Sequence, residues 1–154
     1  MPIRAPRTKG SLSVLGLYPP RQTPRQPSSV TLYKEIGRWV TAVKGVAETL
    51  PEPGDSAATK ELFAFHRDGL TELTTLLIDY TQQQHHPYHN MIKQSKGALT
   101  AAPVAIDKAR QCAKLFGGYS RKPKTYDKVD AAAELRYLLA ALTNMWKWLK
   151  PPTP

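Results

Sequence analysis

The chain of 154 residues carries 22 lysines and arginines against 12 aspartates and glutamates, a formal net charge of +10. This length accommodates one domain of ordinary size with a tail, and the excess of positive charge indicates a polyanionic partner rather than a particular fold. The single cysteine excludes an internal disulfide and a four-thiolate zinc site, and no apolar run is long enough for a membrane-spanning helix.

The first thirty residues contain five basic and no acidic side chains, together with six prolines. Proline fixes φ and lacks an N–H donor, so this stretch cannot form one continuous helix or a central strand. We therefore predict an extended arm over residues 1–28 that neutralises the phosphate backbone of a nucleic acid. The arm residues predicted to do so are Arg4, Arg7, Lys9, Arg21 and Arg25.

The same arm carries apolar residues between its basic groups. A solvated tail has little need of closely spaced apolar side chains, whereas docking onto a neighbouring subunit would bury them. We predict a subunit interface at Leu12, Leu15, Leu17 and Tyr18. Two alternatives stay open: a tail without a fixed role, and an organelle transit peptide, which the prolines disfavour because it requires an amphipathic helix.

Two long helices are expected after the arm. From Leu32 to Leu50 the apolar residues step by four and three positions, the spacing of one helix face, with Ser28 or Ser29 as the N-cap. A second helix is expected from Asp55 or Ser56 to about residue 81, with an apolar inner stripe and an acidic outer side.

The remaining helices are less regular. A short helix is expected within residues 88–99, followed by a helix that Thr100 caps, with Pro103 in its first turn. Gly117 and Gly118 are expected to end that helix, since glycine adopts left-handed geometry without strain. Residues 119–124 are interpreted as an exposed basic loop, and a last helix is expected from about residue 127 to residue 150.

No segment shows sustained alternation of apolar and polar residues, the pattern of a strand. The sequence therefore predicts an all-α antiparallel bundle of about four to five helices over residues 29–150, with a proline-rich tail at 151–154.

The second basic block spans residues 84–126, with eight basic side chains and one acidic one. Lysine and arginine neutralise phosphate, and two tyrosines in the expected loop, Tyr119 and Tyr126, could stack on bases or sugars. The alternative is an ordinary solvated surface. The residues predicted to contact nucleic acid are Lys93, Lys96, Arg110, Lys114, Arg121, Lys122 and Lys124.

Two tryptophans near the C-terminus are a second candidate interface. Trp146 and Trp148 are two positions apart and should point in different directions on a helix. Tryptophan is enriched at interface hot spots, so we predict a subunit contact here, with simple core packing as an equal alternative.

Few residues have the pattern of a catalytic or metal site. His85, His86 and His89 lack a nearby carboxylate or thiolate, so a polar loop is a better interpretation than a metal site. His66 and Cys112 are interpreted as core residues. Phosphate-binding glycine loops, dinucleotide fingerprints and zinc-finger spacings are missing from the sequence, and we predict neither an enzyme nor a cofactor.

These observations predict a structural protein that coats or packages DNA or RNA within a multi-subunit assembly, such as a filamentous coat or nucleocapsid subunit. The alternative is a helical adaptor of a larger protein or ribonucleoprotein complex that binds proteins through its arm and C-terminal helix. A reducing intracellular compartment or a virion suits the single cysteine. Backbone neutralisation carries no base information, so DNA and RNA, single and double strands, stay open.

Overall fold

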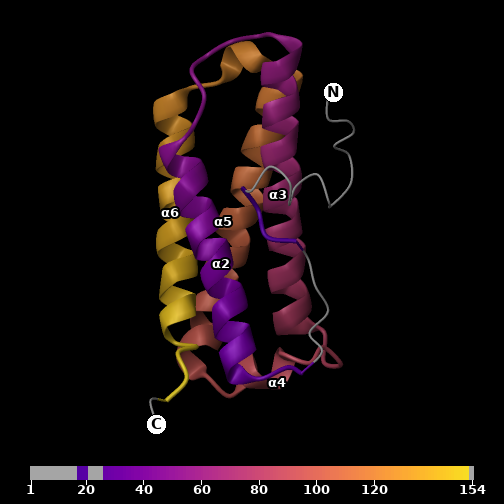
Figure 1. Cartoon of the computed structure of the whole chain (residues 1–154), viewed down its shortest axis with the longest axis vertical. Helices are drawn as coiled ribbons and strands as arrows, with labels where there is room; N and C mark the ends of the chain where they lie inside the picture. The colour runs from indigo at the N-terminus through magenta and orange to yellow at the C-terminus, as the bar shows by residue number, and fades with distance from the viewer. Residues whose placement is uncertain (1–16, 21–25, 153–154) are drawn as a thin grey trace.

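The computed structural model describes residues 17–20 and 26–152, and all regular structure within these ranges is helical. The long helices are α2 (Ser29–Glu48), α3 (Ala57–Gln82), α5 (Lys96–Arg121) and α6 (Lys128–Lys147). Two short elements, α4 (His89–Lys93) and the 3₁₀ turn η1 (Pro123–Thr125), lie at opposite ends of the bundle that they form (Figure 1). The prediction of an all-α bundle is confirmed.

Each long helix begins at a side-chain cap. Ser28, Ser56, Ser95 and Asp127 each accept a hydrogen bond from the backbone N–H three residues later. Such a cap satisfies one of the N–H groups that the first helical turn leaves without an intrahelical partner. The helix starts are thus set by local sequence, and the predicted cap at Ser28 is confirmed.

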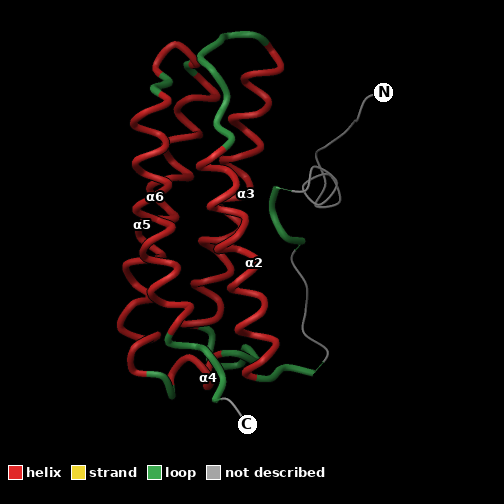
Figure 2. Tube along the Cα trace, turned by 60° about the vertical axis from the view of Figure 1, so that its left-hand side comes forward, coloured by secondary structure: helices red, strands yellow, loops and turns green. Residues whose placement is uncertain are grey.

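Neighbouring long helices meet along four interfaces, which we call seams. In three of them the two backbones approach closely: α3 with α5, α5 with α6, and α6 with α2. This order places α5 diagonally across the core from α2, and Figures 1 and 2 show the four helices running side by side along one axis. The outer faces of α2 and α5 therefore point to opposite sides of the bundle. The fourth seam, between α2 and α3, lacks this close backbone approach.

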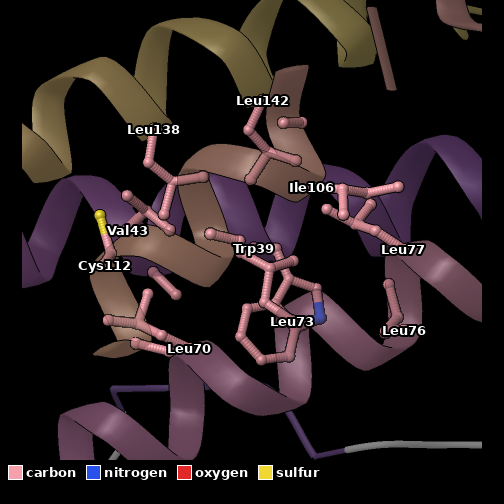
Figure 3. Close-up of a cluster of buried hydrophobic side chains, with 14 of the residues drawn as sticks. Trp39, Val43, Leu70, Leu73, Leu76, Leu77, Ile106, Cys112, Leu138 and Leu142 are labelled. Carbon is pink, nitrogen blue, oxygen red and sulfur yellow. The ribbon is translucent and has the colours of Figure 1, made fainter. Parts of the chain in front are cut away.

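The core consists of the apolar stripes that the sequence predicted on each helix. Trp39 and Val43 of α2 meet leucines of α3, Ile106 and Cys112 of α5, and leucines of α6 (Figure 3). Most of these side chains are completely inaccessible to solvent. Burial of apolar surface on this scale is the main stabilising contribution to such a bundle.

Tyr18 fills the fourth seam. Its ring lies 6.0 Å from the ring of Trp39 and 5.4 Å from that of Phe65, and only 3% of the residue is exposed. A Cβ built on Gly69 would lie 2.5 Å from this ring, so only glycine leaves room for it. The expectation that Tyr18 docks on a neighbouring subunit is wrong, because its own chain buries it.

α5 differs from the prediction at both ends. It begins at Lys96, not near Thr100, and continues through Gly117 and Gly118 to Arg121. Pro103 lies in the helix interior and removes the hydrogen bond to the carbonyl of residue 99; this part of the helix is exposed. Tertiary packing overrides the local stop signal of the two glycines, so the predicted basic loop over 119–124 is mostly helix.

Candidate nucleic-acid interface

Four predicted basic residues form a row along the outer face of α5. Lys96, Arg110, Lys114 and Arg121 are all exposed. At 100° per residue they lie within about 40° of one another around the helix axis, and at 1.5 Å per residue the row is about 38 Å long. We call these four residues the α5 row. Its length depends on the helix being unbroken from Lys96 to Arg121.

Further predicted cations lie at the two ends of the α5 row. Lys93 belongs to the last turn of α4, just before α5, while Lys122 and Lys124 follow α5 at η1; all three are exposed. Among the described residues, the ion pairs are Arg67 with Asp68 and Lys128 with Glu52. None of the seven predicted cations is therefore neutralised by a described acidic residue. Asp107, the one acid of this block, accepts a hydrogen bond from Gln111 at 2.7 Å.

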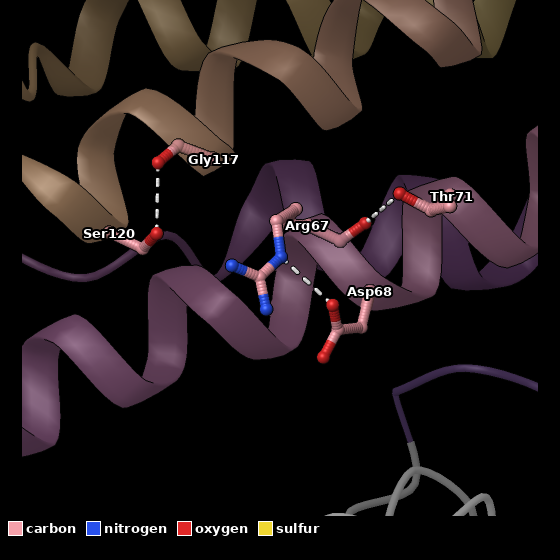
Figure 4. Close-up of polar contacts among 5 residues, drawn as sticks. All are labelled: Arg67, Asp68, Thr71, Gly117 and Ser120. Atoms are coloured by element: carbon pink, nitrogen blue, oxygen red, sulfur yellow. Dashed lines mark hydrogen bonds and ion pairs between the residues drawn. The ribbon is translucent and has the colours of Figure 1, made fainter.

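Arg67 of α3 joins this surface, although the sequence placed it on the acidic helix. A Cβ built on Gly117 would lie 3.4 Å from Cδ of Arg67 and 3.6 Å from a guanidinium nitrogen of Arg121. The two arginines thus meet over the glycine backbone of α5. Arg67 Nε donates to Asp68 at 2.9 Å, and Ser120 Oγ donates to the Gly117 carbonyl at 2.9 Å (Figure 4). Gly117 is buried, and only the packing of α3 against α5 reveals that Arg67 lies next to Arg121.

The prediction that Tyr119 and Tyr126 stack on bases is wrong. Both rings are buried, and they pack with Phe63 at centroid distances of 5.6 and 4.7 Å. Tyr126 also donates a hydrogen bond of 2.7 Å to the Pro51 carbonyl, and burial raises its pKa to about 12. The two tyrosines instead fix the η1 turn that carries Lys122 and Lys124.

The predicted arm contacts are described only in part. Leu17 is half-buried against the core. The other arm residues predicted to bind nucleic acid or a subunit lie outside the described residues: Arg4, Arg7, Lys9, Leu12, Leu15, Arg21 and Arg25.

The two C-terminal tryptophans lie in different environments, as their spacing predicts. Trp146 is half-buried, stacks on Tyr33 with ring centroids 4.9 Å apart, and donates its indole N–H to the Tyr33 carbonyl at 2.9 Å. Trp148 is 55% exposed, yet one side of its ring lies against Gly97, where a Cβ would be 2.1 Å away. Trp146 is thus engaged within the chain, and Trp148 keeps an exposed apolar surface.

The residues considered for chemistry are mostly structural. His66 is buried and shares a hydrogen bond of 2.8 Å with the Tyr18 hydroxyl; burial lowers its pKa to about 4. Cys112 is also buried, which raises its pKa to about 12, and its thiol donates to the carbonyl of Glu134 at 3.4 Å. A thiol held protonated in this way is a poor nucleophile. Both residues are core residues, as predicted.

His85 and His86, two members of the predicted histidine cluster, lie in different environments. His85 is exposed, whereas the ring of His86 lies 4.3 Å from that of Tyr80 and accepts the backbone N–H of Tyr88 at 3.1 Å. Over residues 17–20 and 26–152, no three histidine, cysteine or acidic side chains are grouped so as to hold a metal ion. In the same ranges, none of the helices has the length and apolar character required to cross a bilayer.

Searches for similar proteins found no matching family model, no matching curated protein and no matching solved structure.

Proposed function

We propose that this protein is a non-enzymatic structural subunit that binds the phosphate backbone of a nucleic acid, within a multi-subunit assembly of the coat or nucleocapsid kind. The observation that carries the proposal is the α5 row, four exposed cations on one face of a single helix, three of them in its C-terminal half and with Asp107 as the one acid on that face. Cations without acidic partners are free to replace the condensed counterions of a polyanion, which is the source of sequence-independent affinity.

The dimensions of the row suit a nucleic-acid backbone. Successive phosphates of one strand lie about 3.4 Å apart along a duplex axis, so a row of about 38 Å follows roughly eleven of them. Lys93 at one end, with Lys122 and Lys124 at the other, extends the positive surface beyond the helix itself. The basic arm predicted from the sequence would add contacts of the same kind.

The assembly part of the proposal draws on Trp148. A tryptophan that is 55% exposed at the end of a helix offers a large apolar surface to a second subunit. Repetition of one subunit along a polymer needs contacts of this kind between neighbours, in addition to the contacts with the phosphates.

The test is a pair of variants that lose the same charge. In one, the four residues of the α5 row are replaced by glutamine; in the other, four exposed cations elsewhere are replaced instead, namely Lys44, Lys60, Arg136 and Lys147. Affinity for a duplex of mixed sequence is then measured over a salt series. Each lost phosphate contact lowers the steepness of log affinity against log salt concentration, the salt slope, by about 0.9. We therefore expect the salt slope of the row variant to fall by about 3.6 and that of the control by far less.

Equal slopes for the two variants would contradict the proposal, since only the total charge would then matter. The adaptor alternative would be favoured if the protein purified free of nucleic acid and if its affinity for nucleic acid did not depend on salt. The ratio of absorbance at 260 and 280 nm measures the nucleic acid that copurifies.

A further inference from the structure

A groove of about 980 Å³ runs along the outer face of α2, on the opposite side of the bundle from the α5 row. It is lined by the segment 17–20, by residues of α2 and by Trp146 of α6. This α2 groove is close to the upper limit of the volumes usual for small-molecule sites. A groove of this volume has room for a group much larger than water.

The base of the α2 groove is formed by small residues. Gly37, Thr41, Ala42 and Gly45 lie along it, and no atom of residues 17–20 or 26–152 lies within 4 Å of a Cβ built on Gly45. At Gly45 this base lets a ligand approach the helix backbone closely, whereas the Trp146 ring covers Gly37, 3.1 Å from a Cβ built there. A side chain introduced at Gly45 would therefore occupy the groove without displacing any of the described residues.

The walls combine positive charge with aromatic rings. Lys34 and Arg38 are exposed, and none of the described residues that line the groove is acidic. Tyr33 and Trp146 stack at an interplanar angle of 15°, and the indole N–H bond to the Tyr33 carbonyl fixes this pair in place. Cations beside a rigid aromatic surface are the combination with which proteins hold unpaired nucleotides.

We infer that the α2 groove binds unpaired nucleotides of a single-stranded nucleic acid. Lys34 and Arg38 contact the phosphates, and a base lies against the aromatic surface of Tyr33 and Trp146. In a duplex the bases are stacked within the helix and cannot enter a recess of this kind, whereas the α5 row is open to either form. This inference rests on the proposed function and adds to it a preference for single-stranded over double-stranded nucleic acid.

The decisive variant is Gly45→Leu, which fills the groove, with Gly45→Ala as its matched control. Both remove a helical glycine, so both are expected to keep or raise thermal stability. With full-length protein, we expect Gly45→Leu to weaken binding of a labelled oligo-U about tenfold. Gly45→Ala should bind it like the wild type, and neither variant should change the affinity for a blunt duplex.

A second variant tests the charges. Lys34→Ala with Arg38→Ala should lower the single-strand salt slope by about 1.4, since each contact to a single strand contributes about 0.7. Lys44→Ala, an exposed lysine on the same helix outside the groove, is the control. Photocrosslinking of 4-thiouridine oligo-U should label the peptides that contain Tyr33 or Trp146.

The outcomes separate this inference from the proposed function. If no nucleic acid binds the wild type, the proposed function fails and the inference falls with it. If oligo-U binds Gly45→Leu as well as the wild type, or crosslinks only to α5, the groove inference alone is wrong. Occupation of the groove by residues 11–16 of the arm would also overturn it, shown by a disulfide crosslink within one chain of the double variant Val14→Cys with Gly45→Cys.

Discussion

Two seams of this bundle are closed in different ways. Where α3 meets α5, the two backbones approach closely, because the buried side of α5 is built mostly from small residues: Ala98, Ala101, Ala102, Ala105, Ala109, Cys112 and Ala113. Where α3 faces α2, the ring of Tyr18 stands between the helices instead. Interaxial distance follows the size of the side chains at the contact, so each seam has its own width.

The two seams differ in how their stabilising contacts are distributed. The α3–α5 seam is stabilised by many contacts along two helices of 26 residues each. The α2–α3 seam is held by apolar contacts of Trp39 and Val43 with leucines of α3 and by a hydrogen bond from the Tyr80 hydroxyl to Glu35. At its Tyr18 section it also depends on that ring, on the hydrogen bond of Tyr18 to His66, and on the absence of a side chain at Gly69. Single substitutions should therefore have specific, separable effects at the second seam.

The largest expected effect is at the end of the α3–α5 seam. Phe63 is completely buried and packs on Phe116, Tyr119 and Tyr126. We expect Phe63→Ala to lower the free energy of unfolding by about 4 kcal/mol, because the substitution leaves a cavity between helices that cannot close. Urea denaturation followed by circular dichroism measures this. A loss below about 1 kcal/mol would show that the aromatic cluster is not tightly packed.

The next effect concerns pH at the α2–α3 seam. The pKa of His66 falls from 6.5 to about 4 on folding, chiefly because burial disfavours the charged ring. The unfolded chain therefore binds the proton more readily, and the stability present above pH 6.5 is lost as the pH falls towards 4, by about 3 kcal/mol. Urea denaturation from pH 7 to 4 should show this loss in the wild type but not in His66→Gln. Parallel profiles for the two proteins would contradict it.

A double-mutant cycle probes the contact between Tyr18 and Gly69. Gly69→Ala should destabilise the wild type by about 1 kcal/mol. The new methyl group forces the Tyr18 ring out of its position, and this costs more free energy than the higher helix propensity of alanine gains. In a Tyr18→Ala background the same change should stabilise by about 1 kcal/mol, a coupling of about 2 kcal/mol. If Gly69→Ala has the same effect in both backgrounds, Tyr18 does not occupy the seam in solution.

The smallest expected effect is that of the Tyr18 hydroxyl. Tyr18→Phe keeps the ring in the seam but removes the hydrogen bond to His66, so we expect a loss of about 1 kcal/mol. Thermal unfolding monitored by calorimetry gives the difference. Because the ring stays in place, Tyr18→Ala should cost clearly more, and equal losses would mean that the ring itself contributes little.

Local patterns predicted the helices well and the seams poorly. Apolar spacing and serine caps are properties of neighbouring residues, and they predicted the bounds of the helices at residues 29–48 and 57–82 to within a few residues. The slot for Tyr18 depends on Gly69, 51 positions away, and no local signal connects the two. For the same reason Gly117 was interpreted as a helix stop, although Arg67 packs across it.

The candidate site was predicted in part. The sequence placed Arg110 and Lys114 on one helix face, but the expected stop at the glycines assigned Arg121 to a loop and a later start separated Lys96 from the same helix. Only the continuous helix joins all four. The α2 groove was not predicted, because Trp146 reaches Tyr33 across 113 positions of sequence.

The continuity of α5 has a mechanical consequence. α5 packs against α3 on one side and α6 on another, and it stays helical over 26 residues in spite of Pro103, so the distances between its exposed cations are set by the protein. A flexible polymer lying on it would have to adopt that spacing. Subunits placed end to end would then impose a repeat length on whatever they carry.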